Sequence, residues 1–326
     1  MSISDLTSTQ IGALSTTTIA GLTSTDISTL SSTQLAGLTS AQVVALNSAD
    51  ISVLTSTTLP GLTSAGIAGL TAANILGLTT NAASALSSTQ LGALGTVAVA
   101  AIASTQLVGI GTTNLGGLTS TQVAALSTTA LVNATTETTA LTASQLKGLI
   151  ATQLSNLTST EIGTLSSTQL VGLTSAQVAA LTSADISTLT STTLPGITTA
   201  AIAGLTSADV VALGTTNITS LTPAQFSYLS TTAIAAITTT EIPVLSTTEI
   251  QALTTAQFAA LTVTDVGLLS STEIRALTSQ EIKAFTTAQI GALTTTEMGY
   301  FTTSEASSFT VSQMHVMTAA QIKALA

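Results

Sequence analysis

Large apolar residues recur along the chain at two places in an eight-residue unit, which we call the octad. Counting from Leu6 as position 1, leucine or another large apolar residue returns every eight residues to Leu126, and again from Leu141 to Leu325. Position 6 carries Ile, Leu or Val, positions 2 to 4 are mostly Thr, Ser or Ala, and position 5 is commonly Gln, Asp or Glu. Position 8 is usually Ala or Gly. A seven-residue unit, "ATTETTA" (134–140), separates the two runs.

This spacing fits neither a strand nor one continuous helix. A half-buried strand alternates apolar and polar residues, whereas positions 1 and 6 differ in parity and have four mostly polar residues between them. Eight residues of α-helix turn about 800°, so the apolar stripe would drift by about 80° in each octad and wind around the helix. The pattern therefore predicts that the chain interrupts its helix and starts a new one in every octad.

The start of each short helix is predicted by a capping box. A Ser or Thr hydroxyl at position 2 can accept from the backbone N–H of position 5, and a side chain at position 5 can accept from the N–H of position 2. The apolar residues at positions 1 and 6 then form a hydrophobic staple. Leu157, Thr158, Glu161 and Ile162 represent this arrangement. All acidic residues except Asp5 and Glu137 stand at position 5, where the helix dipole favours negative charge.

Three prolines limit the length of these helices. Pro60, Pro195 and Pro243 occupy position 7, where proline removes a backbone donor from a helix. Those octads are expected to form a single turn or a 3₁₀ helix. The β-solenoid remains an open alternative.

One octad cannot fold alone, because two apolar side chains do not offset the entropy of ordering eight residues. The sequence therefore predicts an all-α solenoid of about forty very short helices, in which each octad is stabilised by its neighbours. Acidic residues 24 apart, such as Asp26 and Asp50, suggest three octads per coil. The small residue at position 8 would allow close approach of the helices.

The chain divides into four predicted segments. Residues 1–133 form a first octad array, 134–140 a seam where a kink or bulge is expected, and 141–225 a second array. Residues 22–70 resemble residues 157–205, which indicates an internal duplication. Every aromatic residue lies in the last segment, residues 226–326, which is predicted to be a C-terminal cap or assembly region.

Composition excludes several classes of partner. With only four Lys and Arg residues and a net charge of −10, the chain has no basic surface for nucleic acid or anionic lipid. Mean hydropathy is +0.62. Ser and Thr nevertheless interrupt every apolar stretch well before the roughly 20 residues that a spanning helix requires, so no membrane insertion is expected. The start "MSISDLTSTQ" does not resemble a cleaved signal peptide.

No catalytic, cofactor-binding or metal-binding residue is predicted. The chain has no cysteine and a single histidine, His315, at position 7, where all four Lys and Arg residues also stand. That position is most simply the solvent-facing one. Helix capping already accounts for the carboxylates. We therefore expect a protein that is not an enzyme and needs no cofactor.

The units "LTSAQVAAL" (173–181) and "LTTAQFAAL" (253–261) resemble the LTxxQIxAL octads of bacterial extracellular and surface proteins. The resemblance extends over practically the whole chain. It implies an extracellular or cell-surface location, reached without a cleaved N-terminal signal peptide.

These features predict a structural protein that assembles with itself into a filament, sheath or surface layer by end-to-end stacking of solenoids. Candidate self-association residues lie near the two ends of the chain: Ile3, Leu6, Ile11, Phe285, Tyr300, Phe301 and Phe309. Two alternatives remain open. One is a monomeric adhesin stalk, or an ice- or surface-binding module using ranked Ser and Thr, and the other is a phage or injection-machine fibre.

Overall fold

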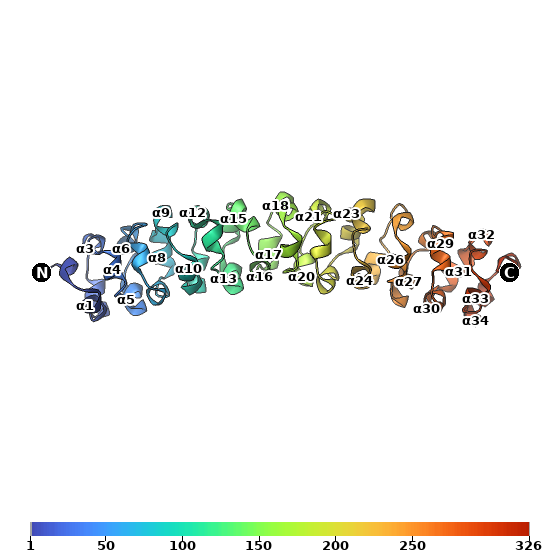
Figure 1. Ribbon diagram of the computed structural model, residues 1–326, viewed down its shortest axis with the longest axis horizontal. Helices are drawn as coiled ribbons and strands as arrows, with labels where there is room; N and C mark the ends of the chain where they lie inside the picture. The colour runs from blue at the N-terminus through green and yellow to red at the C-terminus, as the bar shows by residue number, and fades with distance from the viewer. Residues whose placement is uncertain (1, 326) are drawn as a thin grey trace. The chain divides into compact units, whose positions relative to one another are not determined.

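The computed structural model describes residues 2–325 and divides into two compact units, one ending at Thr164 and one beginning at Leu165. Residues 2–325 contain 35 α-helices, four 3₁₀ helices and no strand. Successive coils of short helices follow one another within each unit (Figure 1). The all-α solenoid prediction is confirmed, and the β-solenoid alternative is wrong.

The helices of the first unit are four to six residues long, apart from the 3₁₀ turns and α12. They are η1 (Ile3–Asp5), α1 (Ser8–Gly12), α2 (Thr16–Ala20), α3 (Ser24–Ser28), α4 (Ser32–Leu35), α5 (Ser40–Ala45), α6 (Ser48–Ser52), η2 (Leu59–Gly61), α7 (Ser64–Ile67), α8 (Ala72–Gly77), α9 (Thr80–Ala83), α10 (Ser88–Ala93), α11 (Thr96–Ala100), α12 (Ser104–Leu115), α13 (Ser120–Ala125), α14 (Thr128–Val132), α15 (Thr135–Thr139), α16 (Ala143–Leu146), α17 (Ala151–Leu154) and α18 (Ser159–Thr164).

The second unit repeats this construction with similar helix lengths. Its elements are α19 (Ser167–Leu170), α20 (Ser175–Val178), α21 (Ser183–Thr188), η3 (Leu194–Gly196), α22 (Thr199–Ile202), α23 (Ser207–Ile218), α24 (Pro223–Phe226), α25 (Thr231–Ile234), η4 (Ile242–Val244), α26 (Thr247–Gln251), α27 (Thr255–Ala260), α28 (Val263–Val266), α29 (Ser271–Arg275), α30 (Ser279–Ala284), α31 (Thr287–Ala292), α32 (Thr295–Met298), α33 (Thr303–Ala306), α34 (Val311–Val316) and α35 (Ala319–Ala324).

Most of the α-helices begin where the octad pattern predicts. In most octads position 2 is the N-cap, in an extended backbone conformation, and position 3 is the first helical residue. In α5, for example, the Thr39 hydroxyl accepts from Gln42 N, and Thr39 N donates to Gln42 Oε1 at 2.8 Å. Where glycine replaces the capping residue at Gly111 and Gly214, φ is 73° and 64°, and α12 and α23 each run across this break.

The proline-containing octads are 3₁₀ turns. Pro60, Pro195 and Pro243 lie inside η2, η3 and η4, each three residues long. Leu59 N donates to Thr55 O four residues earlier, but Pro60 has no N–H to make the next bond of an α-helix, and the turn continues with the shorter bond from Gly61 N to Thr58 O. This prediction is confirmed.

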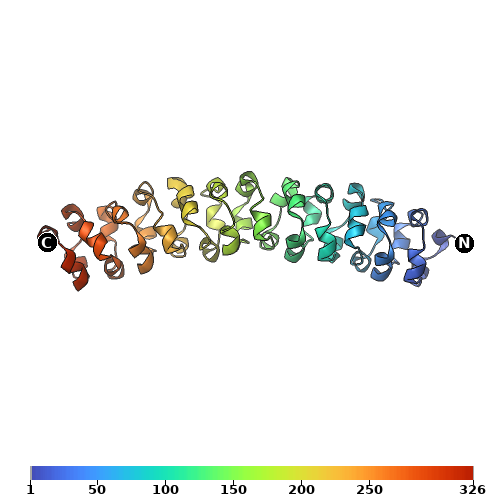
Figure 2. The same cartoon turned by 180° about the vertical axis from the view of Figure 1, so that it is seen from behind.

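Helices three octads apart pack against each other, so that one coil contains three octads. In the first unit α1 packs on α4, α2 on α5 and α3 on α6. In the second unit α26 packs on α29, α28 on α31 and α32 on α35. The same order of helices is visible from behind (Figure 2). The suggestion of three octads per coil is confirmed.

The core consists of the apolar side chains at positions 1 and 6. Leu54 and Ile51 are representative, with at most 2% of their surface exposed. His315 and the four Lys and Arg side chains at position 7 are exposed, as predicted. Among residues 2–325, no helix has the length and apolar character needed to cross a bilayer.

The seven-residue unit 134–140 folds as a shortened octad. It contains α15, whose N-cap, Ala134, has φ −121° and ψ 56° in place of the usual extended conformation. The kink or bulge expected at the seam stays a prediction, and the departure seen in this unit is the conformation of this one N-cap residue. Hydrogen bonds between neighbouring coils continue past this unit. Gln145 Nε2 donates to Leu115 O and Leu118 O, which are 30 and 27 residues earlier, one residue less than in an uninterrupted octad array.

Candidate functional site: the faces between coils

The side chain at position 5 has two distinct hydrogen-bonding ends. In glutamine octads, Oε1 accepts from the backbone N–H of the N-cap and completes the capping box. Thr119 N donates to Gln122 Oε1 at 2.8 Å, and Thr254 N donates to Gln257 Oε1 at 2.7 Å. This end of the side chain was predicted from the sequence.

The other end of the glutamine connects neighbouring coils. Its Nε2 group donates to the position 1 carbonyl in the preceding coil, 28 residues earlier in an uninterrupted octad array. Such bonds, 2.6–2.8 Å long, run from Gln34 to Leu6, Gln42 to Leu14, Gln90 to Leu62, Gln106 to Leu78, Gln122 to Leu94, Gln225 to Ile197, Gln257 to Leu229, Gln289 to Leu261, Gln313 to Phe285 and Gln321 to Leu293. A buried amide therefore satisfies backbone carbonyls that would otherwise lack a partner.

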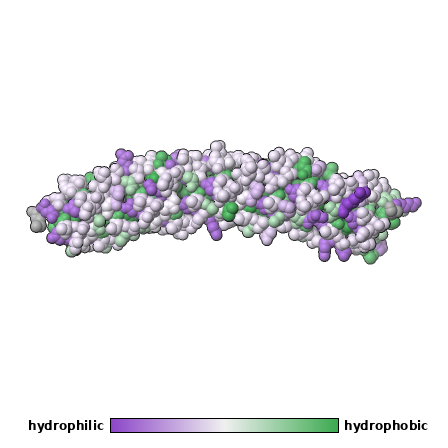
Figure 3. Space-filling view, viewed as in Figure 1, coloured by the Kyte–Doolittle hydropathy of each residue, from purple (hydrophilic) through white to green (hydrophobic). Residues whose placement is uncertain are grey.

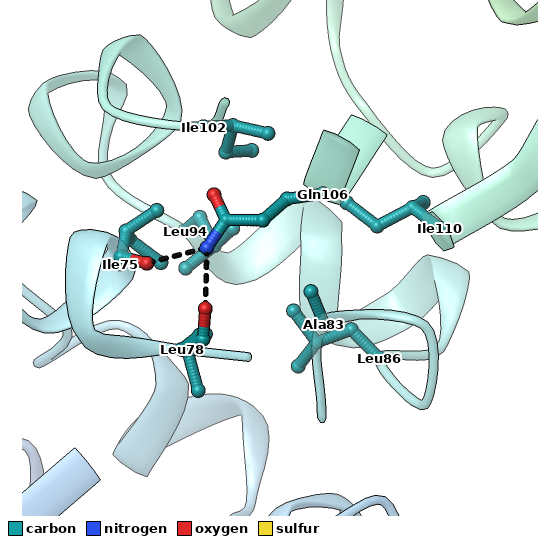
Figure 4. A pocket seen from close by; sticks show the side chains of 8 residues that line it. All are labelled: Ile75, Leu78, Ala83, Leu86, Leu94, Ile102, Gln106 and Ile110. Atoms are coloured by element: carbon teal, nitrogen blue, oxygen red, sulfur yellow. Dashed lines mark hydrogen bonds between the residues drawn. The ribbon is translucent and has the colours of Figure 1, made fainter. Parts of the chain in front are cut away.

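Figure 4 shows this arrangement at Gln106. Its Nε2 atom donates to Ile75 O at 2.7 Å and to Leu78 O at 2.8 Å, while Oε1 accepts from Ala103 N at 2.9 Å. Leu94, Ile102 and other apolar side chains surround the amide (Figure 4). Exclusion of water strengthens the hydrogen bonds and makes the loss of any of them costly.

At Asp50 and Asp209, two of the aspartates at position 5, a serine of the preceding coil takes the place of this contact. Asp50 Oδ2 accepts from Asn47 N, and its Oδ1 accepts from the Ser24 hydroxyl at 3.0 Å. Asp209 and Ser183 repeat the pair at 3.0 Å. A carboxylate has no N–H to donate to a carbonyl of the preceding coil. The contact between the coils is made instead by the serine hydroxyl, which donates to the second carboxylate oxygen.

Three glutamates at position 5 have no such partner. One carboxylate oxygen of each caps its own helix, as between Thr158 N and Glu161 Oε2 at 2.7 Å. The other oxygen of Glu161, Glu241 and Glu281 is buried and makes no hydrogen bond. Among residues 2–325, these three oxygens are the buried side-chain polar atoms without a hydrogen bond, which is unusual in a folded protein.

Asp26 lies in the first coil, and its carboxylate makes only the capping contact with its own helix. Its Oδ2 accepts from the Thr23 hydroxyl at 2.7 Å and from Thr23 N at 2.9 Å. The Thr23 hydroxyl, followed by the Thr23 N–H, holds the pKa of the Asp26 carboxyl below its usual value.

Glycine at position 8 allows the coils to approach closely. A Cβ atom on Gly117 would lie 1.9 Å from Ser88 O, and one on Gly69 would lie 2.2 Å from Ser40 O. In both pairs the serine stands at position 3 of the preceding coil. Position 8 and position 3 are therefore in backbone contact from one coil to the next.

Among residues 2–325, the first coil has a neighbouring coil on one side only. Leu6, Leu14 and Leu22, at position 1, are only partly buried, although Ile11 and the other position 6 side chains of this coil are fully buried. Gln10 is exposed, and its Nε2 group has no acceptor among residues 2–325. We call Leu6, Gln10, Leu14 and Leu22 the N-terminal face.

The last coil presents the opposite side. Met314 and Ile322, at position 6, are 39% and 45% exposed, whereas position 6 residues inside the units are fully buried. Phe309, Val311, Met314 and His315 line an open hollow. Among the described residues, no later glutamine donates to Phe309 O, although Gln313 donates to Phe285 O one coil earlier. We call Phe309, Val311, Met314 and Ile322 the C-terminal face.

The residues predicted from sequence occupy different environments. Leu157 and Ile162 are buried beside the Thr158–Glu161 cap. Of the candidate self-association residues, Ile11, Phe285 and Phe301 are buried inside the chain, so they do not contribute to its surface. The other four, Ile3, Leu6, Tyr300 and Phe309, are partly exposed.

Phe258 and three of the candidate self-association residues, Phe285, Phe301 and Phe309, form a row of aromatic rings inside the second unit. Ring centroids lie 4.9 Å apart between Phe258 and Phe285, 6.2 Å between Phe285 and Phe301, and 5.0 Å between Phe301 and Phe309. All three pairs are edge-to-face, the geometry that aromatic rings favour. The last ring of this row is Phe309, which belongs to the C-terminal face.

Sequence reasoning missed the coil-to-coil role of position 5, and with it Gln10, Met314 and Ile322. One signal was present, because glutamine is frequent at a position where the helix dipole favours acids. An amide must therefore provide something that a carboxylate does not, and this is its N–H donor.

On the face drawn in Figure 3, the lateral surface of the described residues shows no comparable feature. Hydrophobic residues on the visible face form small separate groups (Figure 3). Exposed apolar residues at position 7, such as Val44, Leu76 and Val108, lie on octads that follow different sides of the coil. Among residues 2–325 no group of three His, Asp or Glu side chains could hold a metal ion.

Comparison with protein families identifies the repeat. Residues 19–56 and 263–295 match the family model of the ALTTAQ repeat. At these two stretches the chain is similar to the ALTTAQ repeat. The matched stretches contain α3 to α6 and α28 to α31, in which position 5 is Gln, Asp or Glu and connects or caps the coils as described above. Neither a curated protein nor a solved structure matches the chain.

Proposed function

We propose that this protein is a structural protein that associates with itself by end-to-end stacking of coils. The observation that carries the proposal is the complementarity of the two faces. The N-terminal face presents position 1 side chains and a free amide donor, and the C-terminal face presents position 6 side chains and free carbonyl acceptors. These are the two halves of every internal coil-to-coil contact.

Such a contact joins unlike surfaces, so it does not close into a dimer. Repeated addition of copies would extend a filament, or an array built of filaments. Each joint would bury Leu, Met and Ile side chains and satisfy the exposed Gln10 amide. Burial of apolar surface supplies the main driving force for association.

The test compares substitutions on the C-terminal face with one on the lateral surface. Met314→Lys with Ile322→Lys places two charges in the proposed contact, whereas Leu76→Lys changes an apolar side chain that is 69% exposed on the lateral surface. We expect the unchanged chain and Leu76→Lys to form particles whose mass grows with concentration, measured by sedimentation velocity and negative-stain electron microscopy. The double variant should remain a monomer with unchanged circular dichroism.

A monomeric unchanged chain at every concentration up to the millimolar range would contradict self-association. The protein would then be a stalk or a surface-binding module. Assembly that survives Met314→Lys with Ile322→Lys would place the contact elsewhere.

We also propose an extracellular or cell-surface location. The support is the resemblance of units such as residues 173–181 to the octads of bacterial extracellular and surface proteins. Protease treatment of intact producing cells tests it, with a cytosolic protein as the control. Protection of the chain to the same extent as the control would contradict an external location.

A further inference from the structure

We infer that acid strengthens a contact between two coils of the second unit, because protonation of the Glu281 carboxyl group supplies a hydrogen-bond donor that its ionised form lacks. The contact lies inside one chain, so the inference does not depend on the proposed self-association. It starts from a comparison of glutamate and glutamine at position 5, two side chains of the same shape that differ at one terminal atom.

The Glu281 side chain is held like that of a position 5 glutamine. Its Oε2 atom accepts from Thr278 N at 2.5 Å and from the Thr278 hydroxyl at 2.7 Å, which is the capping contact. The side chain is 4% exposed, and its Oε1 atom is buried without a hydrogen bond. One oxygen is therefore fixed by the helix that it caps, and the other lacks a partner.

The glutamines of the same unit indicate what this second atom meets. Gln257 Nε2 donates to Leu229 O at 2.6 Å and Gln289 Nε2 to Leu261 O at 2.7 Å, each 28 residues earlier. The same spacing leads from Glu281 to Leu253 O, at the start of the octad of α27, and α27 packs on α30. No hydrogen bond to Leu253 O is found among the described residues. The glutamate therefore places an acceptor opposite a carbonyl, where a glutamine places a donor.

A proton removes this mismatch without a change in the distance between the coils. An ionised carboxylate only accepts hydrogen bonds, whereas a protonated carboxyl group also donates one, over an O···O distance of about 2.5–3.0 Å. The glutamine bonds at the equivalent places have the same length. Because this bond exists only in the folded chain, the folded state holds the proton more firmly than the unfolded state, and the contact gains stability as the pH falls.

The charged groups around Glu281 do not supply the missing donor. Neither α27 nor α31 contains a titratable residue, and Lys283 on α30 itself is exposed at position 7. Glu305 stands one coil later, where its carboxylate caps its own helix. Glu273 and Arg275 belong to the preceding helix, α29, and neither makes a hydrogen bond to Glu281 Oε1. The donor at this atom is therefore assigned to the carboxyl proton.

The experiment compares Glu281→Gln with the unchanged chain by urea unfolding at pH 8 and at pH 5. At pH 8 we expect the substitution to raise the folding equilibrium constant by about 5- to 150-fold, because a buried atom without a partner is replaced by a donor. At pH 5 this ratio should be much closer to 1, since the glutamate then has a donor of its own. The ratio cancels the effect of acid on the other carboxylates, which both chains share.

Two further variants accompany this comparison. Gln257→Glu creates the same arrangement one coil earlier, so it should weaken folding by a similar factor at pH 8 and by much less at pH 5. Gln280→Glu makes the same chemical change at an exposed position. Its effect on the folding equilibrium constant should stay below about threefold at both pH values.

Three results would overturn the inference. One is a ratio for Glu281→Gln that is the same at pH 8 and pH 5, and another is a loss from Gln257→Glu that does not lessen in acid. The third is a ratio at pH 8 that falls to 1 when sodium, potassium or calcium chloride is added, because a metal cation, and not a proton, would then complete the contact. End-to-end stacking is tested separately by sedimentation, so its failure and the failure of this inference are distinguishable.

Discussion

At the scale of single residues, the glutamine amide at position 5 both accepts and donates a hydrogen bond, whereas a carboxylate can only accept. Gln257 accepts from Thr254 N and donates to Leu229 O at 2.6 Å, so both ends are satisfied. In Glu281 the second oxygen is buried and makes no hydrogen bond with the described residues. An unsatisfied buried polar atom costs about 1–3 kcal/mol.

We therefore expect Glu281→Gln to stabilise the protein by about 1–3 kcal/mol, because the new Nε2 group can donate to Leu253 O and Ile250 O. The reverse change, Gln257→Glu, should destabilise it by a similar amount. Urea unfolding at pH 7, followed by circular dichroism, measures both. Gln280→Glu makes the same chemical change at an exposed position and should shift the free energy of unfolding by less than about 0.5 kcal/mol. Equal effects at residues 257 and 280 would refute the coil-to-coil role of the amide.

At the scale of the helix, local sequence sets where each element begins, and the neighbouring coil sets how closely it packs. Ser or Thr at position 2 fixes the start, and proline at position 7 reduces an octad to a 3₁₀ turn, as in η2. Both features are local, which is why the sequence predicted them. Packing distance depends instead on contacts such as that of Gly117 with Ser88, whose residues are far apart in the chain.

Gly117→Ala is expected to destabilise the fold by about 1–3 kcal/mol, because its Cβ atom would overlap the Ser88 carbonyl and force two coils apart. The neighbouring change Gly116→Ala is a matched control, since its Cβ atom would meet nothing closer than Thr113 O at 3.6 Å. Thermal unfolding of the two variants provides the comparison. A melting temperature lowered equally in both would show that helix propensity, and not coil spacing, controls the effect.

At the scale of the whole molecule, the sequence predicted the class of fold and the number of octads per coil, but not the atoms that join the coils. Periodicity showed that every octad is a short helix. It could not show that Gln106 reaches Leu78, because a repetitive chain offers many chemically equivalent carbonyls. Nor could it show that Phe285 and Phe301 are buried while Met314 and Ile322 form a face.

Octads are equivalent as packing units, so removal of a whole unit should be tolerated. Deletion of residues 134–140 moves each later octad one place along the coil and leaves every octad with a partner. We expect the circular dichroism per residue to be unchanged and the melting temperature to shift by less than about 5 °C. Deletion of residues 143–146, which removes α16 and leaves half an octad, should lower the melting temperature much further. Similar losses in the two deletions would show that the octad is not the unit of packing.

The tolerance of the coil for its seven-residue unit has an evolutionary consequence. Gln145 keeps its bonds to Leu115 O and Leu118 O across that unit, at 2.8 and 2.9 Å. A gene made of near-identical short segments gains and loses copies readily through slippage and unequal recombination. If the loss of a whole unit is tolerated, as expected for the deletion of residues 134–140, selection can adjust the length of such a protein without first having to repair its structure. The similarity of residues 22–70 to residues 157–205 is the trace that such an event would leave.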